Sequence, residues 1–348
     1  MKISVAMCTF NGEKYIKNQL LSIVHQSRTV DEIIICDDRS TDKTLEICEK
    51  LLKNSGIDYK IYKNEHSLNV VRNFKKCYSL CSGDLIFSCD QDDVWQFDKV
   101  EKIEKAFLDN SNINLVATNA ELIDSNDNIM NLSLREGIGF VMDQPQDALD
   151  WLLNRYCITG ATMAMRKEFA NEYYFVSKYW LHDGWLALVA SLNDSLMYID
   201  DKLIRYRLHG NNQCGIGDVD VLAHGSVDGL RKRKAKKLFH TVLTCPYYFE
   251  DYAFQKKEMY QEVLDEIEKN KWSVDKKNLN KLKECIAFWK KRSIIKEYSL
   301  KQMFLLTRSF KKSNAYEKYC ESKWFSIYDY YFWTVYKLIP RRKKTQNI

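Results

Sequence analysis

Short apolar runs alternate with amphipathic helical patterns through the first part of the chain. The runs KISVAMCTF, DEIIICDD, DYKIYKN and GDLIFSC have the length of buried strands, and INLVATNAELID is also strand-like. Between them, segments such as NGEKYIKNQLLSIVHQ and RSTDKTLEICEKLLKN place apolar residues on one helical face. This alternation predicts an α/β fold in which helices cover both faces of a mainly parallel sheet.

Polar and acidic side chains follow three of the expected strands. Thr9 and Asn11 come after the first strand, Asp37 and Asp38 end the second, and the segment 90–93 follows the fourth. Because ligands of such sheets bind beyond the carboxyl ends of the strands, we expect these side chains to lie near one site. An Asp after a strand is also a common turn former or helix cap, and for Asp37 and Asp38 that interpretation stays open.

The segment 90–93 holds three carboxylates, those of Asp90, Asp92 and Asp93, directly after an apolar run. Capping accounts for at most one of them, and their mutual repulsion requires a positive partner. Mg²⁺ or Mn²⁺ takes oxygen ligands and shares its coordination shell with substrate phosphates. The cluster therefore predicts a divalent metal and a phosphate-bearing substrate. The chain has no G-x-x-x-x-G-K-[ST] motif and no G-x-G-x-x-G after a strand, which disfavours P-loop NTPases and ordinary dinucleotide enzymes.

Seven motifs in series resemble the nucleotide-sugar-binding domain of family-2 glycosyltransferases, which have the GT-A fold. In order, they are CTFNGEKYI, ICDDRSTDKT, NVVRNF, CDQDDVW, ITGATMAM, HDGW and YRLHGNN, and they extend over residues 1–215. The resemblance implies a GT-A domain over residues 1–224. We expect a separate, basic and aromatic-rich region, mostly α-helical, over residues 225–348.

The same resemblance assigns roles to individual residues. It implies that Asp92 and His209 bind the metal, and that Arg207 neutralises the departing diphosphate. For two of the residues a purely structural interpretation stays open: Arg72 could lie on a solvated helix face, and Trp95 could pack in the core. The implied donor-binding residues are Thr9, Asn11, Glu13, Asp37, Asp38, Arg72, Asn73, Asp90, Gln91, Trp95 and Arg207. Further residues expected near the metal or the acceptor are Asp93, Gly160, His182 and Asn212.

Transfer to a sugar hydroxyl requires a base, because a hydroxyl is a poor nucleophile at neutral pH. Asp183 in WLHDGWLALVA is the candidate, although an Asp at the start of a helical stretch is also a common N-cap. The family usually has Glu-Asp where this chain has His182-Asp183, so the departure leaves the base and changes its neighbour. The segment 210–217 is expected to form a lid that closes over bound donor.

The cysteines and the hydropathy pattern indicate a cytoplasmic protein. The eleven cysteines are an odd number without a C-x-x-C pair, which favours reduced, buried thiols over a disulfide framework. The first residues, MKISVAMCTF, are typical of a first strand rather than of a signal peptide. No segment approaches the roughly 20 apolar residues that span a bilayer, so we expect a chain that does not cross a membrane by itself.

The positive charge is concentrated in the C-terminal region. The formal net charge is +6, and the runs RKRKAKK and IPRRKKTQNI hold much of the excess. Basic, aromatic helices lie on anionic membrane surfaces in some proteins. The alternative is a helical subdomain with an aromatic core and a lysine-rich wet face, and both interpretations stay open. No recognised nucleic-acid-binding module accompanies the basic runs.

The sequence therefore predicts an inverting, metal-dependent glycosyltransferase of cell-surface polysaccharide synthesis, in the cytoplasm or at the inner face of the cell membrane. DQDDVW with YRLHGNN resembles the rhamnosyltransferase branch, which implies dTDP-L-rhamnose as donor and a lipid-linked saccharide as acceptor. The alternative donors are UDP-hexoses, for glucosyl, galactosyl or N-acetylhexosaminyl transfer. A sugar-phosphate nucleotidyltransferase would need a glycine-rich, lysine-containing loop, which CTFNGEKYI matches poorly. A non-catalytic binding protein would not need the carboxylates, base and histidine together.

Overall fold

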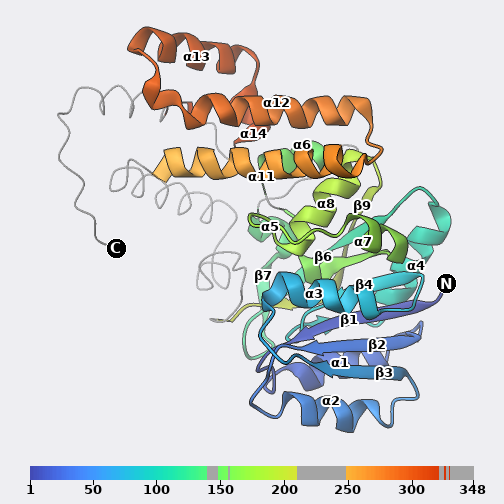
Figure 1. Cartoon of the computed structure of the whole chain (residues 1–348). Helices are drawn as coiled ribbons and strands as arrows, with labels where there is room; N and C mark the ends of the chain where they lie inside the picture. Colours follow the sequence, from blue (N-terminus) through green and yellow to red (C-terminus); the bar gives the residue numbers. More distant parts are fainter. Residues whose placement is uncertain (139–147, 156, 210–247, 321–324, 327–328, 330–348) are drawn as a thin grey trace. The chain divides into compact units, whose positions relative to one another are not determined.

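The computed structural model describes residues 1–138, 148–155, 157–209, 248–320, 325–326 and 329 (Figure 1). The chain divides into two compact units. One consists of residues 1–152 with 156–235, and the other of residues 153–155 with 236–348. The expected domain boundary at 224/225 lies outside the described residues, so its position stays a prediction.

Within the described residues, the larger unit has one sheet of nine strands. They are β1 (Ile3–Thr9), β2 (Glu32–Asp37), β3 (Asp58–Lys63), β4 (Leu85–Cys89), β5 (Val94–Trp95), β6 (Leu115–Ile123), β7 (Ile129–Ser133), β8 (Met163–Arg166) and β9 (Leu196–Arg207). Their order is β3-β2-β1-β4-β8-β6-β9-β5, and β7 pairs with β6.

The pairing confirms the predicted, mainly parallel sheet. β1 pairs in parallel with β2 and β4, and β2 pairs in parallel with β3. β8 lies antiparallel between β4 and β6, whereas β9 runs parallel to β6. Since β1 and β2 align Thr9 with Asp37, the polar residues that follow these strands meet at one edge of the sheet.

Helices cover both faces of this sheet (Figure 1). Ile3, Val5 and Met7 of β1 pack in one cluster with apolar side chains of α1, α2 and α4, and on the other face Tyr78 of α3 donates to Ser88 at 2.9 Å. The helices are α1 (Ile16–Val24), α2 (Thr44–Leu52), α3 (Asn69–Leu80), α4 (Lys99–Asp109), α5 (Leu134–Ile138), α6 (Ala148–Asn154), α7 (Lys167–Tyr173) and α8 (His182–Leu192), with the 3₁₀ turn η2 (Gly160–Thr162).

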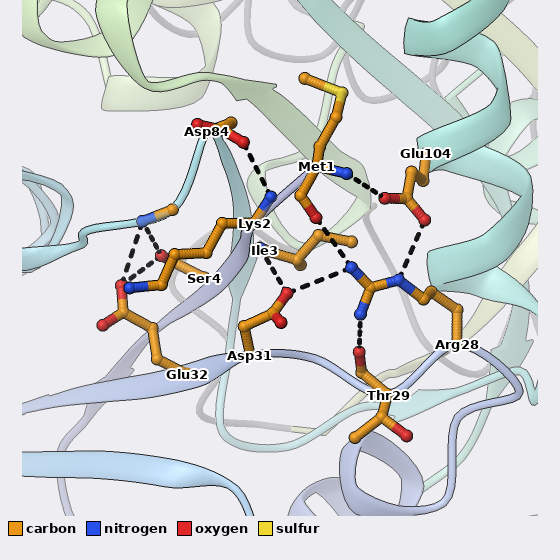
Figure 2. A network of polar contacts seen from close by, with 11 residues as sticks. Met1, Lys2, Ile3, Ser4, Arg28, Thr29, Asp31, Glu32, Asp84 and Glu104 are labelled. Carbon is orange, nitrogen blue, oxygen red and sulfur yellow. Dashed lines mark hydrogen bonds and ion pairs between the residues drawn. The ribbon is translucent and has the colours of Figure 1, made fainter.

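The amino end of β1 is fixed by an ion-pair network (Figure 2). The amino group of Met1 pairs with Glu104 of α4 at 2.9 Å, and Arg28 pairs with both Glu104 and Asp31. Asp31 also accepts a hydrogen bond from the backbone N–H of Ile3. The network anchors the end of the strand opposite to the edge where the polar loops meet.

The cysteines support the prediction of buried thiols. Of the nine cysteines among the described residues, eight are buried and Cys8 is half-buried. Burial raises the pKa of Cys8 to about 11. These thiols therefore stay protonated at neutral pH and pack as small apolar groups.

The smaller unit is helical, as predicted for the C-terminal region. Its elements are α11 (Tyr248–Asn270), α12 (Lys276–Ser293), η3 (Ile295–Glu297), α13 (Leu300–Lys312) and α14 (Ala315–Tyr319), and α11 and α12 form a hairpin (Figure 1). The ring of Phe288 contacts those of Trp289, Phe310 and Tyr316. In the described part of the chain, no helix is long and apolar enough to cross a membrane.

Candidate active site

The loop after β1 is hydrogen-bonded to the turn after β2. Thr9 Oγ1 donates to Asp37 Oδ2 at 2.8 Å, and the N–H of Thr41 donates to Asn11 Oδ1 at 2.9 Å. A carboxylate oxygen of Glu13 accepts from a backbone N–H just before α2. Asn11 has a φ of 48°, a left-handed conformation that Asn tolerates better than most residues. Four predicted donor-binding residues thus lie together in one hydrogen-bonded loop pair.

Asp38 fixes the start of α3. Its carboxylate accepts hydrogen bonds from the side chains of Asn64 and Ser67 and from the backbone N–H groups of Leu68 and Asn69. Burial by itself raises the pKa of Asp38, but these four bonds outweigh it and lower the pKa below its usual value. The carboxylate is thus held ionised by groups of the chain itself.

Asn73 and Arg72 lie on different faces of α3. Asn73 is buried, its amide N–H donates to the carbonyl of Cys36, and its amide oxygen accepts from Asn64. Both ends of its amide thus bind protein groups in the interior, and its expected donor contact stays a prediction. Arg72 is exposed. Its donor-binding role stays a prediction.

Three carboxylates converge beyond the end of β4. Asp93 Oδ1 accepts from the N–H of Arg207 at 2.9 Å, whereas Asp93 Oδ2 is buried with no hydrogen-bond partner in the described structure. Burial, Asp92 and Asp90 raise the pKa of Asp93. Burial, Asp92 and Asp183 likewise raise the pKa of Asp90, so the predicted base lies within electrostatic reach of the cluster. A bound cation would reduce the electrostatic repulsion among these carboxylates.

His209 approaches the same cluster from the end of β9. Its Nε2 atom lies 2.8 Å from Asp92 Oδ2, and its ring stacks on Tyr15 with the centroids 5.3 Å apart. Mg²⁺ binds its ligands octahedrally at about 2.0–2.1 Å, which places adjacent ligand atoms about 3 Å apart. The two atoms therefore fit neighbouring positions on one ion. The described residues contain no group of three or more His, Cys, Asp or Glu side chains placed to hold a metal.

The side chain of Arg207 contacts groups of the protein itself. The side chain is fully buried, and its Nε donates to the carbonyl of Asp92 at 2.7 Å. Its terminal nitrogens donate to the carbonyl of Asp124 at 3.1 Å and to the carboxylate of Asp127 at 2.6 Å, and it lies over the Tyr15 ring. The guanidinium therefore holds the loop that carries Asp92. In this structure the group is buried in the protein, and its expected contact with a diphosphate stays a prediction.

The side chains of Gln91 and Trp95 also contact other parts of the protein. The side-chain amide of Gln91 makes two 2.9 Å hydrogen bonds with the backbone of Phe10, which joins the acidic loop to the loop after β1. A Cβ on Gly12 would lie 2.2 Å from Gln91 Oε1, so a larger residue at this position would displace the Gln91 amide from these two bonds. Trp95 is 4% exposed and packs on Phe87 in the core. Its place in the core, rather than in a pocket wall, is the correct interpretation.

Asp183 lies in the first turn of α8 and is held by two backbone groups. Its Oδ2 accepts from the N–H of Gly160 and its Oδ1 from the N–H of Gly184, each at 2.8 Å. Burial raises the pKa of Asp183 to about 6, against the effect of these two bonds. The N-cap of α8 is Leu181, so Asp183 is not the cap. A carboxylate whose pKa lies close to neutral pH suits general-base catalysis.

Gly160 allows a close approach between η2 and His182. A Cβ at this position would lie 2.8 Å from His182 Nε2. The His182 ring stacks on Phe74 with centroids 4.0 Å apart, and neither ring nitrogen has a hydrogen-bond partner in the described structure. Burial lowers the pKa of His182 to about 3, so the ring is neutral. Glycine thus leaves room for the His182 ring while its N–H binds Asp183.

Two residues near the site were missed by the sequence reasoning. Tyr15 stacks on His209, and Lys99 is completely buried with its Nζ 3.0 Å from the carbonyl oxygen of Ala161. Lys99, Ile103 and Phe107 follow one another at intervals of four residues. That spacing places a charged residue in the apolar stripe of α4, which is the signal that the sequence contained. The predicted residue Asn212 and the expected lid lie outside the described residues.

The fold and the site together define a GT-A glycosyltransferase. The family model for glycosyl transferase family 2 matches residues 4–174. The dTDP-rhamnosyl transferase RfbG of Shigella flexneri is 32% identical over 221 residues, covering 60% of this chain and 73% of that protein. The chain belongs to glycosyl transferase family 2, and this membership decides against the nucleotidyltransferase and the non-catalytic binding protein.

Further relatives show the breadth of the family. The UDP-Glc:alpha-D-GlcNAc-diphosphoundecaprenol beta-1,3-glucosyltransferase WfgD of Escherichia coli is 30% identical over 124 residues, covering 36% of this chain and 47% of that protein. The solved structure of residues 1–349 of S. aureus TarS, in complex with UDP-GlcNAc, has a TM-score of 0.53 at 18% identity, covering 84% of this chain and 73% of that chain. This likeness supports the GT-A fold.

Proposed function

We propose that this glycosyltransferase moves a sugar from a nucleoside-diphosphate sugar to a hydroxyl group in a single displacement that inverts the anomeric centre. The observation that supports the proposal is the buried carboxylate of Asp183, which the N–H groups of Gly160 and Gly184 hold within electrostatic reach of Asp90. The neighbouring Asp92 contacts His209. Asp183 takes the proton of the attacking hydroxyl. The hydrogen bonds from Gly160 and Gly184 keep its carboxylate oriented for that transfer.

Asp92 and His209 would hold a Mg²⁺ or Mn²⁺ ion. Their 2.8 Å separation and the buried, unpartnered Oδ2 of Asp93 support this assignment. When bound, the ion supplies positive charge that stabilises the departing diphosphate. Arg207 contributes by fixing the backbone of Asp92, and Asp93 by fixing the backbone of Arg207.

The loop pair after β1 and β2 receives the nucleoside. Thr9, Asn11, Glu13 and Asp37 form its hydrogen-bonded framework at the carboxyl edge of the sheet, where ligands of parallel sheets bind. Gln91 connects this framework to the acidic loop, so the nucleoside and diphosphate positions are mechanically joined.

We infer that the donor is dTDP-L-rhamnose. The similar protein RfbG is a dTDP-rhamnosyl transferase by name, and the similarity covers 60% of this chain and 73% of RfbG. The name of WfgD describes a UDP-glucose donor, but that alignment is shorter. UDP-hexoses are therefore the competing donors.

The test is the release of nucleoside diphosphate from dTDP-L-rhamnose, UDP-glucose, UDP-galactose and UDP-N-acetylglucosamine, with Mn²⁺ and with EDTA. Release of dTDP that requires metal supports the proposal, and preferential release of UDP moves the donor to a hexose. If none of the four donors released nucleoside diphosphate in a metal-dependent way, that result would contradict the proposal. NMR of the product in the presence of an acceptor reads the anomeric configuration, and retention of that configuration contradicts the single displacement.

We further propose that the acceptor is a lipid-linked saccharide and that the C-terminal unit contacts an anionic membrane surface from the cytoplasm. Leu300, Phe304 and Leu305 of α13 are 44%, 47% and 53% exposed. The same helix contains no acidic residue and carries four cations, Lys301, Arg308, Lys311 and Lys312. Apolar side chains among lysines and arginines suit the interface of an anionic bilayer.

Flotation with vesicles tests the membrane contact. We expect the full chain to bind vesicles that contain phosphatidylglycerol and not vesicles of phosphatidylcholine alone. Phe304→Ser with Leu305→Ser should reduce the bound fraction while the donor-hydrolysis rate in detergent-free buffer stays the same. Equal binding by the wild type and this variant would contradict the role of α13.

A further inference from the structure

A lysine lies buried between the acidic cluster and the turn that binds Asp183. Lys99, the first residue of α4, is 0% exposed, and its Nζ lies 4.0 Å from the centroid of the Trp95 ring. Burying an ammonium group is costly unless opposite charges or hydrogen bonds compensate it, so a buried lysine requires an explanation.

The charges that compensate Lys99 belong to the acidic cluster. Burial lowers the pKa of Lys99 to about 7, and Cys89, Asp93 and Asp90 oppose that fall. In return, Lys99 lowers the pKa values of Asp90 and Asp93, which burial and the neighbouring carboxylates raise. Part of the positive charge that the cluster requires is thus built into the protein.

The hydrogen bond of Lys99 leads to the base. Its Nζ donates at 3.0 Å to the carbonyl oxygen of Ala161, and Ala161 follows Gly160, whose N–H donates to Asp183 at 2.8 Å. The turn η2 is closed by a 3.0 Å bond from the N–H of Thr162 to the carbonyl of Thr159. The turn is therefore fixed by Lys99 on one side and by the carboxylate of Asp183 on the other.

We propose that Lys99 is a positioning residue for the transfer reaction. Its hydrogen bond to Ala161 holds η2 so that the N–H of Gly160 is directed at Asp183. The kinetic consequence rests on the proposed function. The link between Lys99 and the ionisation of Asp183 is a property of the fold and is measurable without substrate.

The test uses full-length protein labelled with ¹⁵N-glycine. Gly160 and Gly184 both donate to Asp183, and Asp90 is the charged side chain that faces it, so in the wild type both amide shifts should titrate together with a midpoint of about 6. In Lys99→Met, we expect the Gly160 amide to lose much of its downfield shift and the common midpoint to rise by about one pH unit. An unchanged Gly160 shift and midpoint would overturn the proposal.

Three further variants keep the test decisive. Lys99→Gln also removes the charge and should give the same changes if Lys99→Met does not fold. Lys99→Arg keeps a charged donor and should restore part of the wild-type titration. Lys102→Met removes an exposed lysine of the same helix, which pairs with Asp98 and Asp201, and should leave both glycine amides unchanged.

Kinetics separate this proposal from the proposed function. With an active donor, Lys99→Met should lower kcat at pH 7 by roughly tenfold to a hundredfold, with little change in donor KM, because a misoriented base slows only the chemical step. The acid limb of its pH profile should shift upward together with the glycine titration. Equal kcat and an equal pH profile in the variant would overturn the role of Lys99. If the wild type turned over no donor, the proposed function would fail, and the glycine titration would still decide the role of Lys99.

Discussion

The Nε2 atom of His209 lies 2.8 Å from Oδ2 of Asp92, although the two residues are 117 positions apart. The short antiparallel pair of β5 and β9 explains this contact. Val94 is opposite Arg205 in that pair, so Asp92 and Arg207 are also opposite each other, just beyond it. The chain leaving β9 then brings His209 to the acidic loop. This register is the structural reason why a metal site can form from distant residues.

Replacing His209 by alanine should weaken metal binding rather than abolish activity. We expect the Mn²⁺ concentration for half-maximal donor hydrolysis to rise roughly tenfold or more, because one of the two protein ligands is lost. His25→Ala is the matched control, since His25 is exposed and contacts only its own helix through Leu21 in the bonds described for it. The same metal dependence in His209→Ala and wild type would contradict the assignment.

Replacing Asp183 by asparagine should abolish transfer and leave donor binding nearly unchanged. The variant keeps the size of the side chain and removes the proton acceptor, so we expect kcat to fall by about 10²–10⁴-fold. Single-turnover assays with excess enzyme, together with nucleotide-binding titrations, measure the two effects separately. A variant that still transferred sugar at the wild-type rate would exclude Asp183 as the base.

The activity should depend on pH through the ionisation of Asp183. Burial raises its pKa to about 6, and the base acts only when ionised. Below pH 6 the ionised fraction falls tenfold per pH unit, so the rate should fall with the same slope. A pH–rate profile between pH 5 and 8 measures this limb. A rate that increases towards low pH would contradict the sign of the prediction.

Arg207→Met should reduce stability rather than raise the KM of the donor alone. The substitution leaves the carbonyl of Asp92 without its described donor, removes one of the two donors to the carbonyl of Asp124, and leaves the carboxylate of Asp127 without its cation. We expect a loss of about 2–4 kcal/mol in the free energy of unfolding. Arg205→Met is the control, because Arg205 is 46% exposed and pairs with Glu121 at the surface. If the Arg207→Met protein had wild-type stability and a weakened donor affinity, the result would support the diphosphate contact that the sequence predicts for Arg207.

The C-terminal unit should depend on the buried pair of Arg292 and Asp329. Both side chains are 2% exposed and form hydrogen bonds of 2.8 and 2.7 Å. Arg292→Met leaves the buried carboxylate of Asp329 without its cationic partner and with only the hydrogen bond from the Tyr316 hydroxyl among those described, so we expect a loss of about 3–5 kcal/mol. Adding Asp329→Asn should recover part of that loss. Hydrogen exchange of the amides in α12 and α14 measures the change within this unit.

Much of the fold was predictable because strand and helix periodicities are local. The runs around Ile34 and Phe87 are continuous and apolar, as expected for strands buried on both faces, and the segment of α3 repeats its apolar residues with helical spacing. The antiparallel insertion of β8 between β4 and β6 was not predictable in this way. Its four residues are too few for a pattern, and its place depends on pairing with distant strands.

The candidate site was predictable in composition but less so in the role of each residue. The motifs in series placed Asp92 and His209 at one site, and these two side chains are in contact. Whether a polar side chain faces substrate or protein depends on its tertiary partners. Arg207 and Asn73 face the interior, and no local sequence pattern indicates this. Lys99 is a buried charge, which composition alone does not distinguish from the many surface lysines.

The most direct test of the account is the thermal stability of the full chain with dTDP, dTDP-L-rhamnose and UDP, with and without Mn²⁺, in the wild type and in Asp92→Asn. The account predicts that dTDP and its sugar raise Tm only when Mn²⁺ is present, and that Asp92→Asn loses this increase. A wild-type protein that no nucleotide stabilises in the presence of Mn²⁺, or a full increase without metal, would contradict it.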